Sequence, residues 1–145
     1  MQARSPADQR AVMAAQLAGF RRVPIASPGL RAASVAVAIV IRQRALCLLI
    51  TKRAANLRHH GGQWALPGGS RDPGESAEEA ARRELREETS LVVQASDVLG
   101  VLDDYRTRSG YVITPVVVWG GTAEHRPAGP GRRGRADTRD PAGRP

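Results

Sequence analysis

Apolar and polar residues alternate in blocks along the middle of the chain, and these blocks predict strands. Residues 35–41 and 45–52 are apolar and rich in β-branched side chains, with a short polar turn between them, so they predict two strands. Residues 97–105 and 111–119 predict two more strands, joined by the polar segment RTRSG. Together with one helix, described next, this mixed order of elements indicates an α/β domain.

A helix is predicted over residues 76–89. Ser76 is followed three residues later by Glu79, which is the capping box that marks the start of a helix. The preceding segment, PGGSRDPGE, is rich in glycine and proline and therefore reads as a loop.

Three glutamates occupy one side of this predicted helix. At about 100° per residue, Glu84, Glu87 and Glu88 fall on the face that carries the small apolar residues, while most arginines fall opposite. Carboxylates on a packing face repel one another and lose solvation, and a divalent cation removes that penalty. The alternative is an exposed helix held by Glu/Arg pairs four residues apart.

The chain divides into three parts by composition. Residues 1–33 form an arm with a short helix at 8–19, followed by a proline-containing linker. Residues 34–120 form the ordered domain. Residues 121–145 contain no Val, Ile, Leu, Met or aromatic residue, so they cannot bury enough apolar surface to offset the entropy of ordering, and we expect disorder there.

The charge distribution bears on possible partners. The formal net charge is +8, of which the first part carries +4, the middle +1 and the last +3. A basic excess suggests a nucleic-acid binder, but this excess lies in the two ends, and the tail lacks aromatic residues for base stacking. We therefore do not expect nucleic acid as the partner, although a basic binding protein remains an alternative.

Cysteine content and hydropathy indicate the compartment. Cys47 is the only cysteine, so an internal disulfide is excluded and a reducing environment fits. No stretch approaches the roughly 20 apolar residues of a membrane span, and no apolar segment of a signal peptide precedes Arg21. We expect a cytoplasmic protein that does not enter a membrane. Its oligomeric state is not predicted.

The glycine-rich loop and the helix together resemble the signature of the Nudix hydrolases, G-x5-E-x7-R-E-U-x-E-E-x-G-U, in which U is a bulky aliphatic residue. The matching residues are Gly69, Glu75, Arg83, Glu84, Leu85, Glu87, Glu88 and Leu91. Ser90 stands where the signature has glycine, which supplies a left-handed residue at the helix end. Serine adopts that conformation at a cost of about 1 kcal/mol, so this departure bears on stability rather than on chemistry.

The resemblance implies an α/β/α sandwich with a mixed sheet and hydrolysis of a nucleoside diphosphate linked to another group. It also implies Mg²⁺ or Mn²⁺, with Glu84 and Glu88 as the principal ligands. Glu87 is then a further ligand or the base that activates water, and the Gly69 carbonyl faces a metal. The remaining motif residues, Glu75 and Arg83, form a pair that holds the loop against the helix.

Residues 49–69 resemble a second pattern, L-L-T-x-R-[SA]-x3-R-x3-G-x3-F-P-G-G, typical of the coenzyme A pyrophosphatases. The residues that fit are Thr51, Arg53, Ala54, Arg58, Gly62, Pro67, Gly68 and Gly69. This resemblance implies cleavage of coenzyme A or its thioesters to 3',5'-ADP and 4'-phosphopantetheine. Arg53 and Arg58 suit phosphate contacts, although Arg58 can also be a solvated loop residue. Another Nudix substrate, such as ADP-ribose, is the alternative.

The resemblance ends near residues 119–125, where Nudix domains continue with further strands and a final helix. We therefore expect the C-terminal part of the domain to be missing, through a frameshift or a truncated gene prediction close to Ala128. A sheet face without its closing helix would stay exposed. An inactive, truncated relic is therefore a further alternative.

Overall fold

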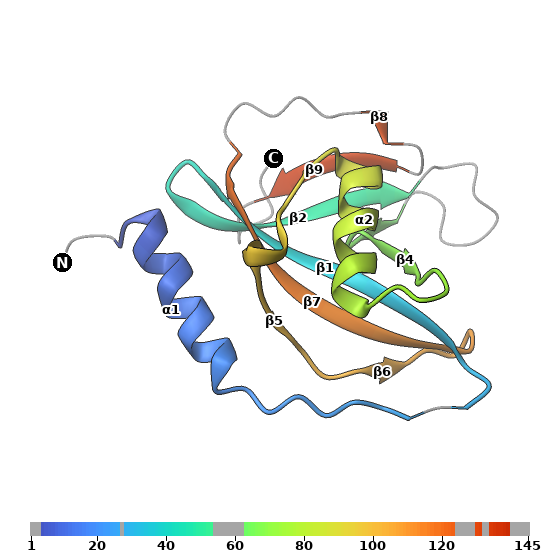
Figure 1. Cartoon of the computed structure of the whole chain (residues 1–145). Coiled ribbons are helices and arrows are strands. Elements are labelled where there is room, and N and C mark those ends of the chain that lie inside the picture. Colours follow the sequence, from blue (N-terminus) through green and yellow to red (C-terminus); the bar gives the residue numbers. More distant parts are fainter. Residues whose placement is uncertain (1–3, 27, 54–62, 124–129, 132–133, 140–145) are drawn as a thin grey trace.

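The computed structural model describes residues 4–26, 28–53, 63–123, 130–131 and 134–139. These residues form two α-helices, one short 3-10 helix and one sheet (Figure 1). The helices are α1 (Pro6–Ala18), α2 (Ala77–Thr89) and η1 (Ala95–Asp97). The strands are β1 (Arg31–Arg42), β2 (Ala45–Arg53), β3 (Trp64–Ala65), β4 (Gly68–Ser70), β5 (Val98–Val101), β6 (Tyr105–Arg106), β7 (Tyr111–Thr122), β8 (Pro130–Gly131) and β9 (Gly134–Arg139).

The sheet is mixed, which confirms the predicted α/β class. Its strand order is β5-β7-β1-β2-β9-β8, with β3 paired to β2, β4 to β1 and β6 to β7. The long central strands β1 and β7 run parallel, whereas β1 pairs with β2 and with β4 in the antiparallel direction. The short strand β4 therefore lies beside the first half of β1.

The turn between β1 and β2 has the geometry of a tight hairpin. Gln43 and Arg44 have φ values of 51° and 64°, and Arg42 pairs directly with Ala45. Positive φ at both central residues gives a turn whose twist matches that of the flanking strands. The predicted strand pair is confirmed.

Helix α2 covers one face of the sheet, where the apolar core lies. The core is formed by alternate residues of the central strands, by the inner side of α2 and by the segments that follow α2 and β7: Ala36, Ala38, Val40, Cys47, Leu49, Ala81, Leu85, Leu91, Val93, Val116, Val118 and Ala123. Small residues on both sides let the helix approach the strands closely. The same close packing brings α2 against the short strand β4.

The N-terminal arm packs against the domain. Helix α1 lies along β5 (Figure 1), where a side chain on Gly100 would come within 2.8 Å of Leu17. Arg10 also forms an ion pair of 2.9 Å with Asp97, the last residue of η1. Neither described helix has the length and apolar character that crossing a membrane requires.

The strand expected over residues 97–105 is interrupted. Residues 95–97 form η1, and β5 and β6 are separated at residues 102–104. Asp103 and Asp104 accept hydrogen bonds from the main-chain N–H groups of Val23 and Ile25 in the arm. These contacts replace ladder pairing at the break, and a sequence pattern does not show them because the partners are about 80 residues apart.

Beyond residue 120, the parts that the structure describes include strands where disorder was expected. Strand β7 continues to Thr122, and β9 pairs antiparallel with β2 from Leu48↔Arg139 to Arg53↔Gly134. The prediction rested on missing apolar side chains, but a ladder is formed by main-chain N–H and C=O groups. A polar segment can therefore occupy the edge of β2.

Candidate functional site

Both ends of α2 are fixed by local hydrogen bonds. The Ser76 hydroxyl accepts from the N–H of Glu79 at 3.1 Å, and the Glu79 carboxylate accepts from the N–H of Ser76 at 3.2 Å. At the other end Ser90 adopts the left-handed conformation with φ 64°, and its N–H donates to the Arg86 carbonyl. The predicted capping box and the left-handed end are confirmed.

Two glutamates of α2 are buried against β4. The residues Glu84 and Glu88 are only 2% and 8% exposed. The N–H of Gly68 donates to Glu88 Oε2 at 3.1 Å, and a Cβ atom on Gly69 would lie 2.5 Å from Glu84 Oε1. A side chain at position 69 would thus force the buried Glu84 carboxylate to move, and glycine leaves it in place.

Glu87 does not share this packing face, and the prediction that it does is wrong. Its side chain is 40% exposed, and Oε2 accepts a hydrogen bond of 3.3 Å from Arg83. On the helix it lies about 60° from Glu84 on the side away from Glu88. The covered face of α2 is narrower than predicted and reaches only the other two carboxylates.

Arg83 connects the loop to the helix. It binds both carboxylate oxygens of Glu75, at 2.8 Å and 3.0 Å, and it donates to the carbonyl of Ser70 at 3.0 Å. It also donates to Glu84 Oε1 at 3.0 Å. The structure thus brings Glu75 and Arg83 together. The hydrogen bond from Arg83 lowers the pKa of Glu75, and the bond to Glu75 raises the pKa of Arg83.

The oxygen atoms around β4 suit a hard divalent cation. The carboxylates of Glu84 and Glu88 and the main chain of Gly69 lie together, and oxygen ligands of this kind are those that Mg²⁺ and Mn²⁺ prefer. Ser34 pairs with Gly69, is fully buried, and has a hydroxyl without a hydrogen-bond partner among the described residues. The residues therefore fit the ion.

The three glutamates of α2 do not all point to one position in this structure. Within the described part of the chain, no three Asp, Glu, His or Cys side chains are grouped closely enough to hold a metal. Glu87 completes a set of three carboxylates only if its side chain rotates away from Arg83. That rotation would break the 3.3 Å hydrogen bond from Arg83 to Glu87, whose side chain is partly exposed.

The two arginines expected to bind substrate are not tested by this structure. Arg53 ends β2, but its side chain lies outside the described part of the structure, as does the whole of Arg58. Their proposed phosphate contacts remain predictions.

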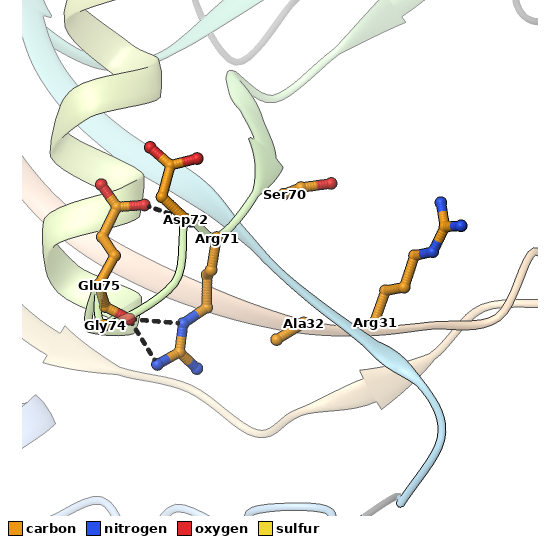
Figure 2. Close-up of a pocket in the computed structure, with 7 residues that line it drawn as sticks. All are labelled: Arg31, Ala32, Ser70, Arg71, Asp72, Gly74 and Glu75. Carbon is orange, nitrogen blue, oxygen red and sulfur yellow. Dashed lines mark hydrogen bonds between the residues drawn. The ribbon is translucent and has the colours of Figure 1, made fainter.

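A shallow pocket beside the loop brings in arginines that the sequence did not single out. Its volume is about 450 Å³, and it is lined by Arg31, Ala32, Ser70, Arg71, Asp72, Gly74 and Glu75. Figure 2 shows Arg71 turned toward the main-chain carbonyl of Glu75, to which it donates two hydrogen bonds of 3.1 Å and 2.8 Å. Arg31 is separate in sequence and joins the pocket only through the pairing of β1 with β4.

Comparison with known proteins identifies the domain type. A family model described as the NUDIX domain matches residues 31–129. A curated relative from Cronobacter sakazakii, named "Uncharacterized Nudix hydrolase NudL", is 47% identical over 79 residues. That alignment covers 54% of this chain and 41% of the relative, so the match spans less than half the length of the curated protein.

Solved structures share the fold. A NUDIX hydrolase from Nitrosomonas europaea matches with a TM-score of 0.62 and 19% identity, over 83% of this chain and 63% of that one. The NUDIX domain of Shewanella oneidensis NrtR, complexed with ADP ribose, matches with a TM-score of 0.54 and 24% identity, over 88% of this chain and 80% of that one. At these identities the likeness concerns the fold alone.

Proposed function

This chain belongs to the Nudix family, and we propose that it hydrolyses the pyrophosphate bond of a nucleoside diphosphate derivative with Mg²⁺ or Mn²⁺. The observation that carries the proposal is the burial of Glu84 and Glu88 against Gly68 and Gly69. Two buried carboxylates need compensating positive charge and N–H donors. Arg83 and the N–H of Gly68 supply part of this compensation, and a divalent cation bound between the two glutamates would supply the rest.

The chemistry assigned to each group follows from its position. A bound divalent ion neutralises pyrophosphate charge and lowers the pKa of water. Glu84 and Glu88 would hold the ion, with the Gly69 carbonyl as a further ligand. Glu87 is exposed to solvent, so its carboxylate can accept a proton from the attacking water or join the ligands. Arg83 holds Glu75 and Glu84 in place.

Within the family we propose coenzyme A or an acyl-coenzyme A as the substrate. The support is the pattern of residues 49–69, with Arg53 and Arg58 available for the additional 3'-phosphate. Guanidinium groups bind phosphate in a bidentate manner. The products would be 3',5'-ADP and 4'-phosphopantetheine or its acyl form.

The central prediction concerns Glu88→Gln. We expect the unchanged chain to release 3',5'-ADP from coenzyme A with Mg²⁺ or Mn²⁺, and we expect this variant to be slower by about 100-fold or more. The reason is that a metal contributes several kcal/mol of charge stabilisation. Product formation is measured by chromatography.

Glu78→Gln is the matched control, because it makes the same change on the same helix outside the site. Glutamine can keep the bond to the N–H of Gly68, so circular dichroism of the Glu88 variant should match that of the control. Full activity of Glu88→Gln would contradict the metal assignment.

ADP-ribose is the second candidate substrate. It is favoured by the solved NUDIX domain that carries ADP ribose and shares the fold. A substrate panel with the Arg53→Ala variant separates the two candidates. Loss confined to coenzyme A turnover supports the first, whereas turnover of ADP-ribose alone by the unchanged chain supports the second.

A further inference from the structure

Ser34 carries a buried polar group to which no role has been assigned above. Its side chain is fully buried in β1, and its hydroxyl has no hydrogen-bond partner among the described residues. Most buried polar side-chain atoms in folded proteins have a partner, so an exception calls for an explanation. The position of this hydroxyl in the sheet supplies one.

The alternation of β1 places the Ser34 side chain on the face of the sheet that α2 covers. Successive side chains of a strand point to opposite faces. Ala36 and Ala38 pack in the core under α2, and Ser34 is two residues before Ala36, so it points the same way. The hydroxyl therefore lies between the sheet and the helix that carries the glutamates.

Pairing with β4 brings this hydroxyl toward Glu84. Ser34 lies directly opposite Gly69 in an antiparallel pair, and the β-carbons of such a pair are on the same face, about 4.5–5.5 Å apart. A Cβ atom on Gly69 would lie 2.5 Å and 3.1 Å from the two carboxylate oxygens of Glu84. Since glycine has no side chain, no atom of a side chain at position 69 separates Ser34 from this carboxylate.

The hydroxyl on the neighbouring strand is already engaged. Thr114 of β7 is in register with Ser34, and its hydroxyl donates to Asp104 Oδ1 at 2.7 Å. Two hydroxyl groups thus lie side by side on the same face of the sheet, and one of them holds the carboxylate that binds the N-terminal arm. The carboxylate that faces the other one, Ser34, is Glu84.

We propose that Ser34 is a positioning residue for Glu84, and that its hydroxyl donates to the Glu84 carboxylate when this glutamate binds the divalent ion. The inference rests on the proposed function, which makes Glu84 a ligand. Carboxylates that bind metals are themselves held by hydrogen bonds from surrounding residues. Arg83 already donates to Glu84, but its positive charge opposes that of a metal ion, whereas a neutral hydroxyl orients the carboxylate without this repulsion.

The test is Ser34→Ala, which removes one oxygen atom and leaves the backbone and the Cβ atom in place. We expect its Mn²⁺ affinity, measured by calorimetric titration, to fall about tenfold or more, as for other residues that orient a metal ligand. In EDTA the urea midpoint of unfolding should stay the same or rise, because the substitution removes a buried hydroxyl that has no partner. Ser96→Ala is the matched control, because Ser96 is exposed, and it should change neither quantity.

Two results for Ser34→Ala would overturn the inference. One is an unchanged Mn²⁺ affinity. The other is a lower urea midpoint in EDTA, which would show that the hydroxyl supports the fold without any ion.

Glu88→Gln separates this inference from the proposed function. If the unchanged chain binds Mn²⁺, and if binding is lost in Glu88→Gln but kept in Ser34→Ala, only the role of Ser34 is refuted. If the unchanged chain binds no Mn²⁺, the proposed function is refuted, and the role of Ser34 with it.

Discussion

Two small residues, Gly69 and Ser90, set the main-chain geometry around the carboxylates of α2. Gly69 has no room for a Cβ atom beside Glu84. Ser90 has room but takes a left-handed conformation that a side chain disfavours. The first residue therefore affects the site and the second affects stability, and substitutions separate the two effects.

Gly69→Ala should disturb the proposed metal site directly. The added methyl group would lie within 2.5 Å of Glu84 Oε1, so the carboxylate must move. We expect Mn²⁺ affinity, measured by calorimetric titration, to fall about tenfold or more, as for changes that displace a metal ligand. Gly19→Ala is the control, because the nearest atom to its new methyl group is at an ordinary 3.7 Å. Unchanged Mn²⁺ affinity in Gly69→Ala would contradict the proposal that Glu84 binds the ion from the position it has in this structure.

Ser90→Gly should stabilise the chain without changing catalysis. Glycine adopts positive φ without a steric cost, so relief of this strain should raise the free energy of unfolding by about 0.5–1 kcal/mol. Urea denaturation measures the change through the transition midpoint. A midpoint that stays the same or falls would show that the left-handed serine carries no strain.

The break between β5 and β6 is the element that holds the N-terminal arm. Asp104 accepts hydrogen bonds from the Ile25 N–H at 3.0 Å and from the Thr114 hydroxyl at 2.7 Å, and it forms an ion pair with Arg22. Burial acts to raise the pKa of this carboxyl, but the three donors outweigh it, so the pKa is lowered. Because Tyr105 follows directly, the same contacts fix the start of β6.

The lowered pKa of Asp104 determines how the stability of the fold changes with pH. A carboxyl with a folded pKa below its unfolded value of about 3.9 stabilises the fold above that pH. This stabilisation is lost as the pH falls through the pKa that Asp104 has in the folded state. The loss therefore occurs below about pH 4. Asp104→Asn should lower the free energy of unfolding by about 1–3 kcal/mol at pH 7. It should also make stability fall less steeply at acid pH, as measured by thermal unfolding. A fall at acid pH as steep as that of the unchanged chain would contradict this assignment.

At the scale of the whole molecule, local patterns predict more than distant contacts do. The capping box of α2 and the β1–β2 hairpin follow from neighbouring residues, and the structure confirms both. The docking of the arm on Asp104 joins residues about 80 positions apart, and β9 pairs through main-chain atoms. Neither leaves a periodic signal in the sequence.

In the candidate site, too, the sequence predicts the features set by neighbouring residues and misses those set by distant contacts. Helical periodicity places Glu84 and Glu88 correctly on the packing face, but it does not give the width of the face that β4 covers, so it wrongly includes Glu87. Ser34 faces Glu84 only because β1 and β4 are neighbours in the sheet. That neighbourhood is a property of the topology.

The contacts of Arg83 have a consequence for the order of events in maturation. Its guanidinium bonds to Glu84, Glu75 and Glu87 and so acts as a built-in counter-ion for the helix. We therefore expect that α2 can pack on the sheet without an external ion. If a divalent ion binds these glutamates as proposed, its capture would be an exchange, in which the incoming cation replaces an arginine that already holds the carboxylates in place.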